Sequence, residues 1–247
     1  MQIYVLYMSE NTSPLAAILI IGNEILSGRT KDLNSSFLAQ KLLSIGIFVG
    51  EIRVVSDKKS EIIAALNTLR ERYDYVFSSG GIGPTHDDIT SDCVAEAFGV
   101  PLHINNEAKQ LLMSYYAKEN IELNQARLRM ARIPTGAFLI ENPISKAPGF
   151  QISNVFVLAG VPKIFQAMVE EILQKLAPKK AIVSRTVTKN KPEGEIAEKL
   201  AKIASRFPEV SIGSYPFETK GIIGTNLVVT HQDEKTILKV VFQLSKI

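Results

Sequence analysis

The sequence predicts an α/β protein, a three-layer sandwich around a mostly parallel sheet, followed by a small α+β domain. Short apolar runs alternate with segments whose apolar residues recur at helical spacing as far as residue 177. The first run, Ala16–Ile21, is apolar at every position, which is typical of a strand buried on both faces of a parallel sheet. Alternation of this kind favours helices on both faces of the sheet.

The other elements of the sandwich follow in order along the chain. The spacing of Leu38, Leu42 and Ile45 predicts a helix that ends at Gly46, because glycine readily adopts the left-handed conformation at a helix terminus. Apolar content and periodicity predict the rest. We expect strands at Ile47–Val55, Tyr75–Ser79, Ala137–Ile140 and Val155–Leu158, and helices at Ser60–Leu69, Asp88–Phe98, Asn106–Lys118, Asn124–Ala131 and Lys163–Leu176.

The pattern changes near Pro178, and together with an N-terminal extension this predicts three segments. Residues 1–15 are expected to form an N-terminal extension, residues 16–177 the sandwich domain, and residues 181–247 the small domain. The small domain has the order strand, helix, two strands and helix, which is typical of an α+β unit with its own core. Its elements are expected at Val183–Thr188, Ile196–Phe207, Val210–Tyr215, Leu227–Thr230 and Thr236–Leu244.

Composition excludes several classes of function. The 28 Lys and Arg residues barely exceed the 25 Asp and Glu residues and form no long basic block, so we expect no nucleic-acid partner. No segment approaches the roughly 20 consecutive apolar residues that span a bilayer, so we expect no membrane partner. Cys93 is the only cysteine, which rules out an internal disulfide and favours a cytoplasmic protein.

The connection Ser78–Thr90, SSGGIGPTHDDIT, carries the strongest functional signal. It follows a predicted strand and precedes a predicted helix, where open α/β sheets bind ligands. Three glycines, Gly80, Gly81 and Gly83, allow backbone N–H groups to turn towards a phosphate. Pro84 stiffens the turn, and the Thr85 hydroxyl can donate to a phosphate oxygen. The spacing matches neither the Walker A loop nor the dinucleotide fingerprint.

Asp87 and Asp88 do not suit direct phosphate contact, because carboxylates repel phosphate. A divalent cation such as Mg²⁺, Mn²⁺ or Co²⁺ resolves this, since such ions combine one or two carboxylates with substrate phosphates and water. The alternative is that one of the two aspartates caps the next helix.

Three further connections lie at the same predicted sheet edge. In the first, Glu24, Ser27, Gly28 and Asn34 either line the site or form a long loop capped by Asp32 or Asn34. In the second, Asp57 is either another carboxylate of the site or a helix cap. The third connection contributes Lys146, Pro148 and Gly149, which either bind substrate or only form a turn.

These motifs together resemble a known family. The residues Gly22–Gly28, Asn34-Ser35, Ser56-Asp57, Gly80–Thr90 and Asn142–Phe150 are similar to the N-terminal domain of CinA, the competence/damage-inducible protein A. That domain belongs to the molybdopterin-binding group that includes MogA and MoaB. The later part of the chain resembles the small domain that follows in CinA and in the N-terminal half of eukaryotic FAD synthases.

The resemblance implies two different activities. A CinA-like protein is a metal-dependent pyrophosphatase of ADP-ribose or FAD-like dinucleotides, whereas a MogA-like protein binds molybdopterin and adenylylates it. Asp88 matches the catalytic aspartate of the MogA-type motif, and Asp57 matches its second carboxylate. Asp87 and the small domain favour the pyrophosphatase, which is our first hypothesis. Molybdopterin as the ligand is the second, and a non-catalytic nucleotide-binding module the third.

The resemblance also implies a homo-oligomer, a dimer or trimer, that takes a small nucleotide or pterin. The chain departs from the family at three places, one of which is Ala159 in place of a proline before Gly160. Asn23 stands where relatives of CinA usually have aspartate, and Ile144-Ser145-Lys146 replaces a turn that usually contains Gly-Thr. These departures bear on the preferred substrate more than on the fold.

Overall fold

The computed structural model describes residues 14–176, 183–219 and 221–247. They divide into two compact units, one made of residues 14–43 and 47–176 and the other including residues 183–219 and 221–247. Most of the predicted extension, residues 1–13, and the segment 177–182 lie outside the described residues.

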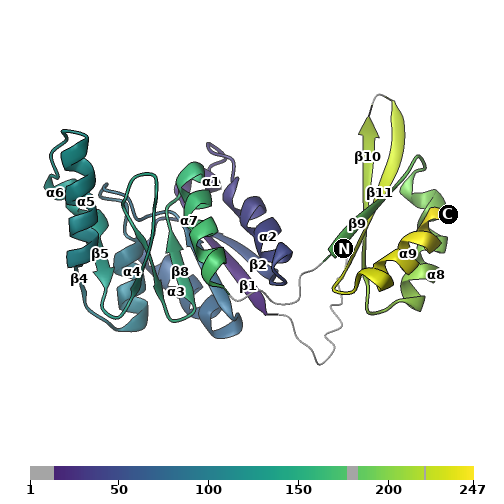
Figure 1. Cartoon of the computed structure of the whole chain (residues 1–247), viewed down its shortest axis with the longest axis horizontal. Helices are drawn as coiled ribbons and strands as arrows, with labels where there is room; N and C mark the ends of the chain where they lie inside the picture. Colours follow the sequence, from purple (N-terminus) through teal and green to yellow (C-terminus); the bar gives the residue numbers. More distant parts are fainter. Residues whose placement is uncertain (1–13, 177–182, 220) are drawn as a thin grey trace. The chain divides into compact units, whose positions relative to one another are not determined.

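The larger unit is built on a six-stranded sheet with the strand order β2-β1-β3-β8-β7-β6 (Figure 1). The first four of these are parallel, and β7 and β6 complete the sheet in antiparallel pairing. Such a mixed but mostly parallel sheet confirms the predicted fold class. The strands are β1 (Leu15–Ile21), β2 (Phe48–Val55), β3 (Tyr75–Ser79), β6 (Phe138–Ile140), β7 (Gly149–Ile152) and β8 (Val155–Leu158).

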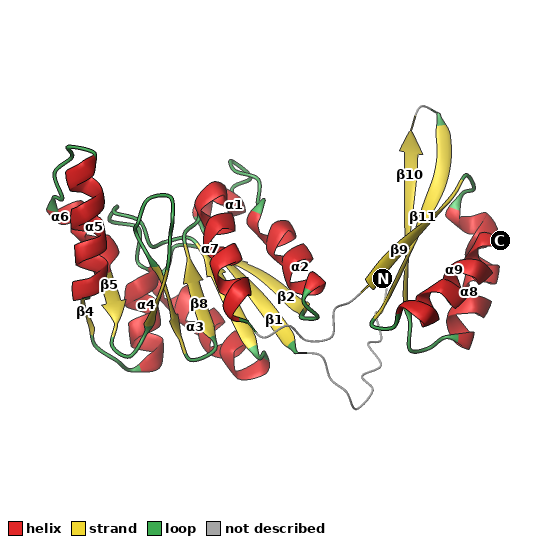
Figure 2. Cartoon of the chain, in the orientation of Figure 1, coloured by secondary structure: helices red, strands yellow, loops and turns green. Residues whose placement is uncertain are grey.

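Helices cover both faces of this sheet (Figure 2). α2 (Asn34–Ser44) and α7 (Pro162–Lys175) lie on one face, and α3 (Lys59–Arg72) and α4 (Thr90–Phe98) on the other. The remaining elements are two short strands that pair with each other, β4 (Leu102–Ile104) and β5 (Arg132–Pro134), and the helices α1 (Asn23–Leu26), α5 (Asn106–Lys118), α6 (Gln125–Leu128) and η1 (Arg129–Ala131).

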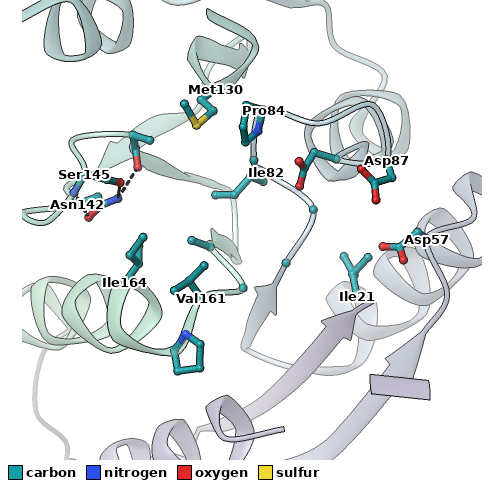
Figure 3. Close-up of a pocket in the computed structure, with 18 of the residues that line it drawn as sticks. Ile21, Asp57, Ile82, Pro84, Asp87, Met130, Asn142, Ser145, Val161 and Ile164 are labelled. Atoms are coloured by element: carbon teal, nitrogen blue, oxygen red, sulfur yellow. Dashed lines mark hydrogen bonds between the residues drawn. The ribbon is translucent and has the colours of Figure 1, made fainter. Parts of the chain in front are cut away.

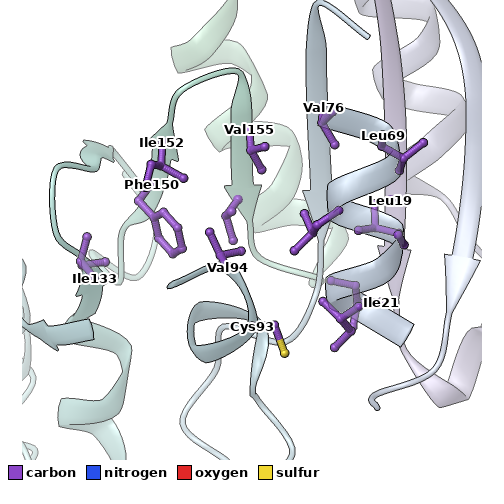
Figure 4. Close-up of a cluster of buried hydrophobic side chains, with 14 of the residues drawn as sticks. Leu19, Ile21, Leu69, Val76, Cys93, Val94, Ile133, Phe150, Ile152 and Val155 are labelled. Atoms are coloured by element: carbon purple, nitrogen blue, oxygen red, sulfur yellow. The ribbon is translucent and has the colours of Figure 1, made fainter. Parts of the chain in front are cut away.

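The core explains why the apolar runs form central strands. All residues of β1 after Leu15 are buried, because alternate side chains face opposite layers of helices. On one face, Leu19 and Ile21 pack with Leu69 of α3 and Val94 of α4 (Figure 4). Burial of this apolar surface holds the sheet edge, and therefore the loops that leave it, in fixed positions.

The structure differs from the predicted elements where side chains bond locally. α4 begins at Thr90, two residues later than expected, because Asp88 closes a turn with Thr85. α3 begins at Lys59 after Lys58, so Ser60 is not its cap. The short strands β4, β5 and β7 were not predicted, since three or four residues are too few to show a period.

The smaller unit is an α+β fold, which confirms the predicted class. Its three-stranded antiparallel sheet has the order β10-β11-β9. Leu227 and Val229 of the central strand pack against Ile196 and Ile237 of the two helices. The elements are β9 (Val183–Lys189), α8 (Glu193–Arg206), β10 (Ser211–Thr219), β11 (Ile222–His231) and α9 (Glu234–Ser245).

Helix length and apolarity bear on membrane insertion. Across residues 14–176, 183–219 and 221–247, no helix is both long enough and apolar enough to span a bilayer.

Candidate functional site

A cleft of about 480 Å³ opens in the larger unit where β1, β3 and β8 end (Figure 3). Its walls come from the loops that follow these three parallel strands, from the loop after β2 and from the loop between β6 and β7. This is the position at which open α/β sheets bind ligands. The loop after β3, residues 80–89, crosses the middle of the cleft, and we call it the glycine loop.

Two glycines of this loop cannot be replaced without strain. Gly80 has a φ of 108° and Gly81 a φ of 71°, in the region that favours glycine. A Cβ at Gly80 would overlap the carbonyl oxygen of Ile21, and one at Gly81 would overlap the hydroxyl of Thr90. The same hydroxyl donates to the Gly80 carbonyl at 2.9 Å, which ties the start of α4 to the loop.

The hydroxyl of Thr85 brings two carboxylates together. Its oxygen lies 2.5 Å from Oδ1 of Asp87 and 2.6 Å from Oδ2 of Asp88. The backbone N–H of Thr85 also donates to Asp88 Oδ2, at 2.8 Å. Because a hydroxyl has a single proton, it can donate to only one carboxylate at a time, and the other oxygen faces a lone pair. Both aspartates line the cleft.

The charge of Asp87 is stabilised by this contact. The hydrogen bond from Thr85 is the main cause that lowers the pKa of Asp87 below its ordinary value. The carboxylate is therefore anionic at neutral pH, as a metal ligand must be.

The donor set suits a divalent cation that the substrate helps to hold. Among the described residues, no three His, Cys, Asp or Glu side chains converge as a ready-made metal site. Ions such as Mg²⁺ need only one or two carboxylates when phosphate oxygens and water complete the shell. Asp87 and Asp88, which both contact the hydroxyl of Thr85, fit that requirement.

The loops after β1 and β2 form the next part of the wall. Asp57 and Glu24 both line the cleft. Asp57 Oδ2 accepts a hydrogen bond from the backbone N–H of Asn23 at 2.8 Å, so one carboxylate oxygen joins the two loops. Ser27 and Gly28 lie outside the cleft wall and close the short helix α1, where the Ser27 hydroxyl donates to the Glu24 carbonyl.

Asn34 holds two strand ends in place. Its side chain is buried, and Nδ2 donates to Ser79 Oγ and to the Gly160 carbonyl, both at 2.8 Å. Asp32 Oδ1 accepts from the N–H groups of Asn34 and Ser35, so Asp32 and not Asn34 caps α2. Asn34 lines a smaller cavity of about 60 Å³ that shares Glu24 and Gly160 with the cleft.

The end of the cleft away from the aspartates is less polar than the end that contains them. Figure 3 shows Asn142, Ser145 and Ile164 on the side of the glycine loop opposite Asp57 and Asp87. The walls there are mostly apolar. They include Ile82, Met130, Val161 and Ile164.

The residues predicted for the site fall into two groups. Those that line the cleft are Glu24, Asp57, Gly80, Gly81, Gly83, Pro84, Asp87 and Asp88. Those that do not are Ser27, Gly28, Asn34, Thr85, Lys146, Pro148 and Gly149. Thr85 acts on the aspartates, as described above, and Lys146 Nζ lies 3.1 Å from Glu141. Gly149 is buried in β7, where a Cβ would overlap the Val157 carbonyl.

Sequence reasoning missed Met130, Ser145 and Ile164. Met130 lies in η1, inside a segment that was predicted only as a helix. Ile164 lies in the first turn of α7 and has the spacing of a core residue. Ser145 had one signal, because it stands where the sequence departs from the turn of the resembling family.

Comparison with known proteins gives the family. Residues 17–179 match the model described as "Probable molybdopterin binding domain", and residues 181–246 match "FAD synthase, middle domain". A crystal structure of CinA from Thermoplasma acidophilum is 36% identical and superposes with a TM-score of 0.61, covering 67% of this chain and 99% of that one.

Two curated relatives extend the similarity along the sequence. A Pyrococcus furiosus protein is 34% identical over 94% of this chain and 96% of its own length. A Caenorhabditis elegans protein named "Probable FAD synthase" is also 34% identical over 94% of this chain, which spans 49% of that longer protein. These findings confirm the resemblance predicted from the motifs: the protein belongs to the molybdopterin-binding domain family and is similar to CinA and to FAD synthases.

Proposed function

We propose that the protein is a divalent-metal-dependent pyrophosphatase of ADP-ribose or FAD-like dinucleotides. One observation carries the proposal: four carboxylates, those of Glu24, Asp57, Asp87 and Asp88, line the same cleft as the glycine loop. A cleft that only binds an anion gains nothing from carboxylates beside it. Carboxylates beside a phosphate loop are useful when a cation lies between them and the phosphates.

The roles of the residues follow from their positions. Backbone N–H groups of Gly81 and Gly83 would hold the diphosphate, and Asp87 and Asp88 would hold Mg²⁺, Mn²⁺ or Co²⁺. When bound, such an ion neutralises phosphate charge and lowers the pKa of a coordinated water. Thr85 would fix both carboxylates in position, and Asp57, on the loop after β2, would orient or deprotonate the attacking water.

The relatives support a nucleotide substrate. The Caenorhabditis elegans relative is named "Probable FAD synthase", and FAD contains a diphosphate bond of the proposed kind. The smaller unit matches the middle domain of FAD synthase, so the similarity to such proteins covers both units of the chain.

The second candidate is a molybdopterin-binding protein that adenylylates its ligand. The match of residues 17–179 to the molybdopterin-binding domain model favours it. Both candidates place a diphosphate against the glycine loop, so the substrate itself must discriminate between them. The third candidate, a non-catalytic nucleotide-binding module, gives the carboxylates no role.

The experiment measures AMP release from ADP-ribose, FAD and NADH, each with EDTA, Mg²⁺, Mn²⁺ or Co²⁺. We expect metal-dependent release that falls at least about 10³-fold in Asp88→Asn, which keeps the oxygen that accepts from Thr85 but loses the charge. Asp74→Asn is the matched control, since Asp74 also accepts a backbone N–H, from Leu15 at 2.8 Å, but does not line the cleft.

Two results would contradict the proposal. Undiminished turnover in Asp88→Asn would remove this carboxylate from the mechanism. No AMP release with any metal, together with tight binding of molybdopterin, would favour the second candidate.

A further inference from the structure

The end of the cleft away from the aspartates contains a hydroxyl group whose role as a hydrogen-bond acceptor the structure fixes. It belongs to Ser145, in the loop between β6 and β7, and Ser145 lines the cleft (Figure 3). The loop around it, residues 142–147, is held by Asn142, whose side chain is buried.

Asn142 uses its complete hydrogen-bonding capacity inside this loop. Its Nδ2 donates to Ser145 Oγ at 2.7 Å and to the Ala147 carbonyl at 2.9 Å. Its Oδ1 accepts from the backbone N–H groups of Ile144 at 3.0 Å and Ser145 at 3.2 Å. The amide cannot be reversed, because a reversed amide would set its oxygen against the Ala147 carbonyl and its NH₂ group against two N–H donors.

The Ser145 hydroxyl must therefore accept from Asn142 and donate its own proton elsewhere. No hydrogen bond from this proton to another group occurs among the described residues. Since Ser145 is half-buried and lines the cleft, this proton is free to point into the cleft. A half-buried donor of this kind is satisfied when a ligand brings an acceptor.

The surroundings of this donor are uncharged. The neighbouring cation, Lys146, is paired with Glu141 and does not line the cleft. Ile82, Met130 and Ile164 supply apolar walls. A phosphate would lack a counter-charge here, whereas a flat ring would cover the apolar walls and present nitrogen or carbonyl acceptors at its edge.

We propose that this end of the cleft binds the heteroaromatic base of the nucleotide, and that Ser145 donates a hydrogen bond to an acceptor on the edge of the base. The inference rests on the proposed function in one respect, the choice of a nucleotide as ligand. It makes Ser145 a residue that determines specificity, while the diphosphate lies at the glycine loop.

The test compares a ligand that has a base with one that has none. Calorimetric titration would use AMP, the part that ADP-ribose and FAD share, and inorganic pyrophosphate, both with Mg²⁺. The variants are Ser145→Ala, Ser145→Thr, which keeps a hydroxyl, and Ser60→Ala, an exposed serine of α3, as the control.

We expect Ser145→Ala to weaken AMP binding about five- to tenfold, the loss of one hydrogen bond, and to leave pyrophosphate binding unchanged. Ser145→Thr should restore most of the AMP affinity. Where turnover is measured, KM for ADP-ribose should rise by the same factor at constant kcat, because the bond is present before and during the reaction.

The outcomes separate this inference from the proposed function. AMP binding that depends on Ser145 in a protein without turnover would support the inference and contradict the pyrophosphatase. Three results would overturn the inference: AMP affinity unchanged in Ser145→Ala, an equal loss for AMP and pyrophosphate, or no binding of AMP to the unmodified protein.

Discussion

The glycine loop and the loop 142–147 line the same cleft, but they are held in shape by different means. The glycine loop depends on its backbone, because Gly80 and Gly81 adopt conformations and close approaches that exclude a side chain. The loop 142–147 depends on one buried side chain, Asn142, which makes four hydrogen bonds. A substitution of either glycine would therefore disturb the backbone of the first loop, whereas a substitution of Asn142 would remove four hydrogen bonds from the second.

The largest expected effect on stability tests the backbone of the glycine loop. Gly80→Ala should lower the free energy of unfolding by about 3 kcal/mol, because it combines an unfavourable φ with an overlap against the Ile21 carbonyl. Urea denaturation measures it. Gly99→Ala is the matched control, since Gly99 has a φ of 65° but nothing within 4 Å of an added Cβ. It should cost about 1 kcal/mol. Equal losses in the two variants would show that the overlap is relieved.

The next effect tests the loop 142–147. Asn142→Ala should destabilise the larger unit by about 2 kcal/mol, because the N–H groups of Ile144 and Ser145 lose their acceptor. It should also weaken AMP binding although Ser145 is still present, since nothing then orients the hydroxyl. Thermal denaturation and calorimetric titration measure the two effects. A destabilised variant with unchanged AMP affinity would mean that Asn142 does not position Ser145.

The difference between the two loops also explains which parts of the fold and of the cleft could be predicted from the sequence. The glycine loop was recognised because its glycines, Pro84, Thr85 and the two aspartates are contiguous in the sequence, and the chemistry of each residue type suggests its role. The sheet was recognised because strands such as β1 are apolar throughout. Both signals can be read in a window of a few residues.

The apolar end of the cleft could not be recognised in this way. Met130, Ser145 and Ile164 come from three separate elements and meet only in the folded chain. The role of Ser145 depends on which way the Asn142 amide points, and no periodicity encodes that. Conversely, Gly149 was predicted to bind substrate because it belongs to a motif, and the structure buries it in β7. A motif predicts where the backbone turns more reliably than it predicts which side chain faces the cleft.

A smaller effect should stabilise the protein. Lys146 has a φ of 58°, a conformation that is unfavourable for residues other than glycine by about 1 kcal/mol. Lys146→Gly should therefore raise the free energy of unfolding by up to about 0.5 kcal/mol, after the added entropy of the unfolded chain and the lost ion pair with Glu141 are subtracted. A loss of stability in urea denaturation would show that the lysine contributes more than its strain costs.

The smallest expected effect concerns the charge on the glycine loop. Because the pKa of Asp87 is lowered in the folded protein, its carboxylate stabilises the fold above the unfolded-state pKa, and this contribution is lost as the pH falls through the folded-state pKa. Thr85→Val removes the hydroxyl that is the main cause, so the Asp87 titration observed by carboxyl-carbon NMR should move up towards its ordinary value. Asp233, whose lowered pKa depends on Thr236 in the smaller unit, should not move. An unchanged titration of Asp87 in Thr85→Val would mean that the pKa of Asp87 does not depend on the Thr85 hydroxyl, whereas the orientation of Ser145 depends on Asn142.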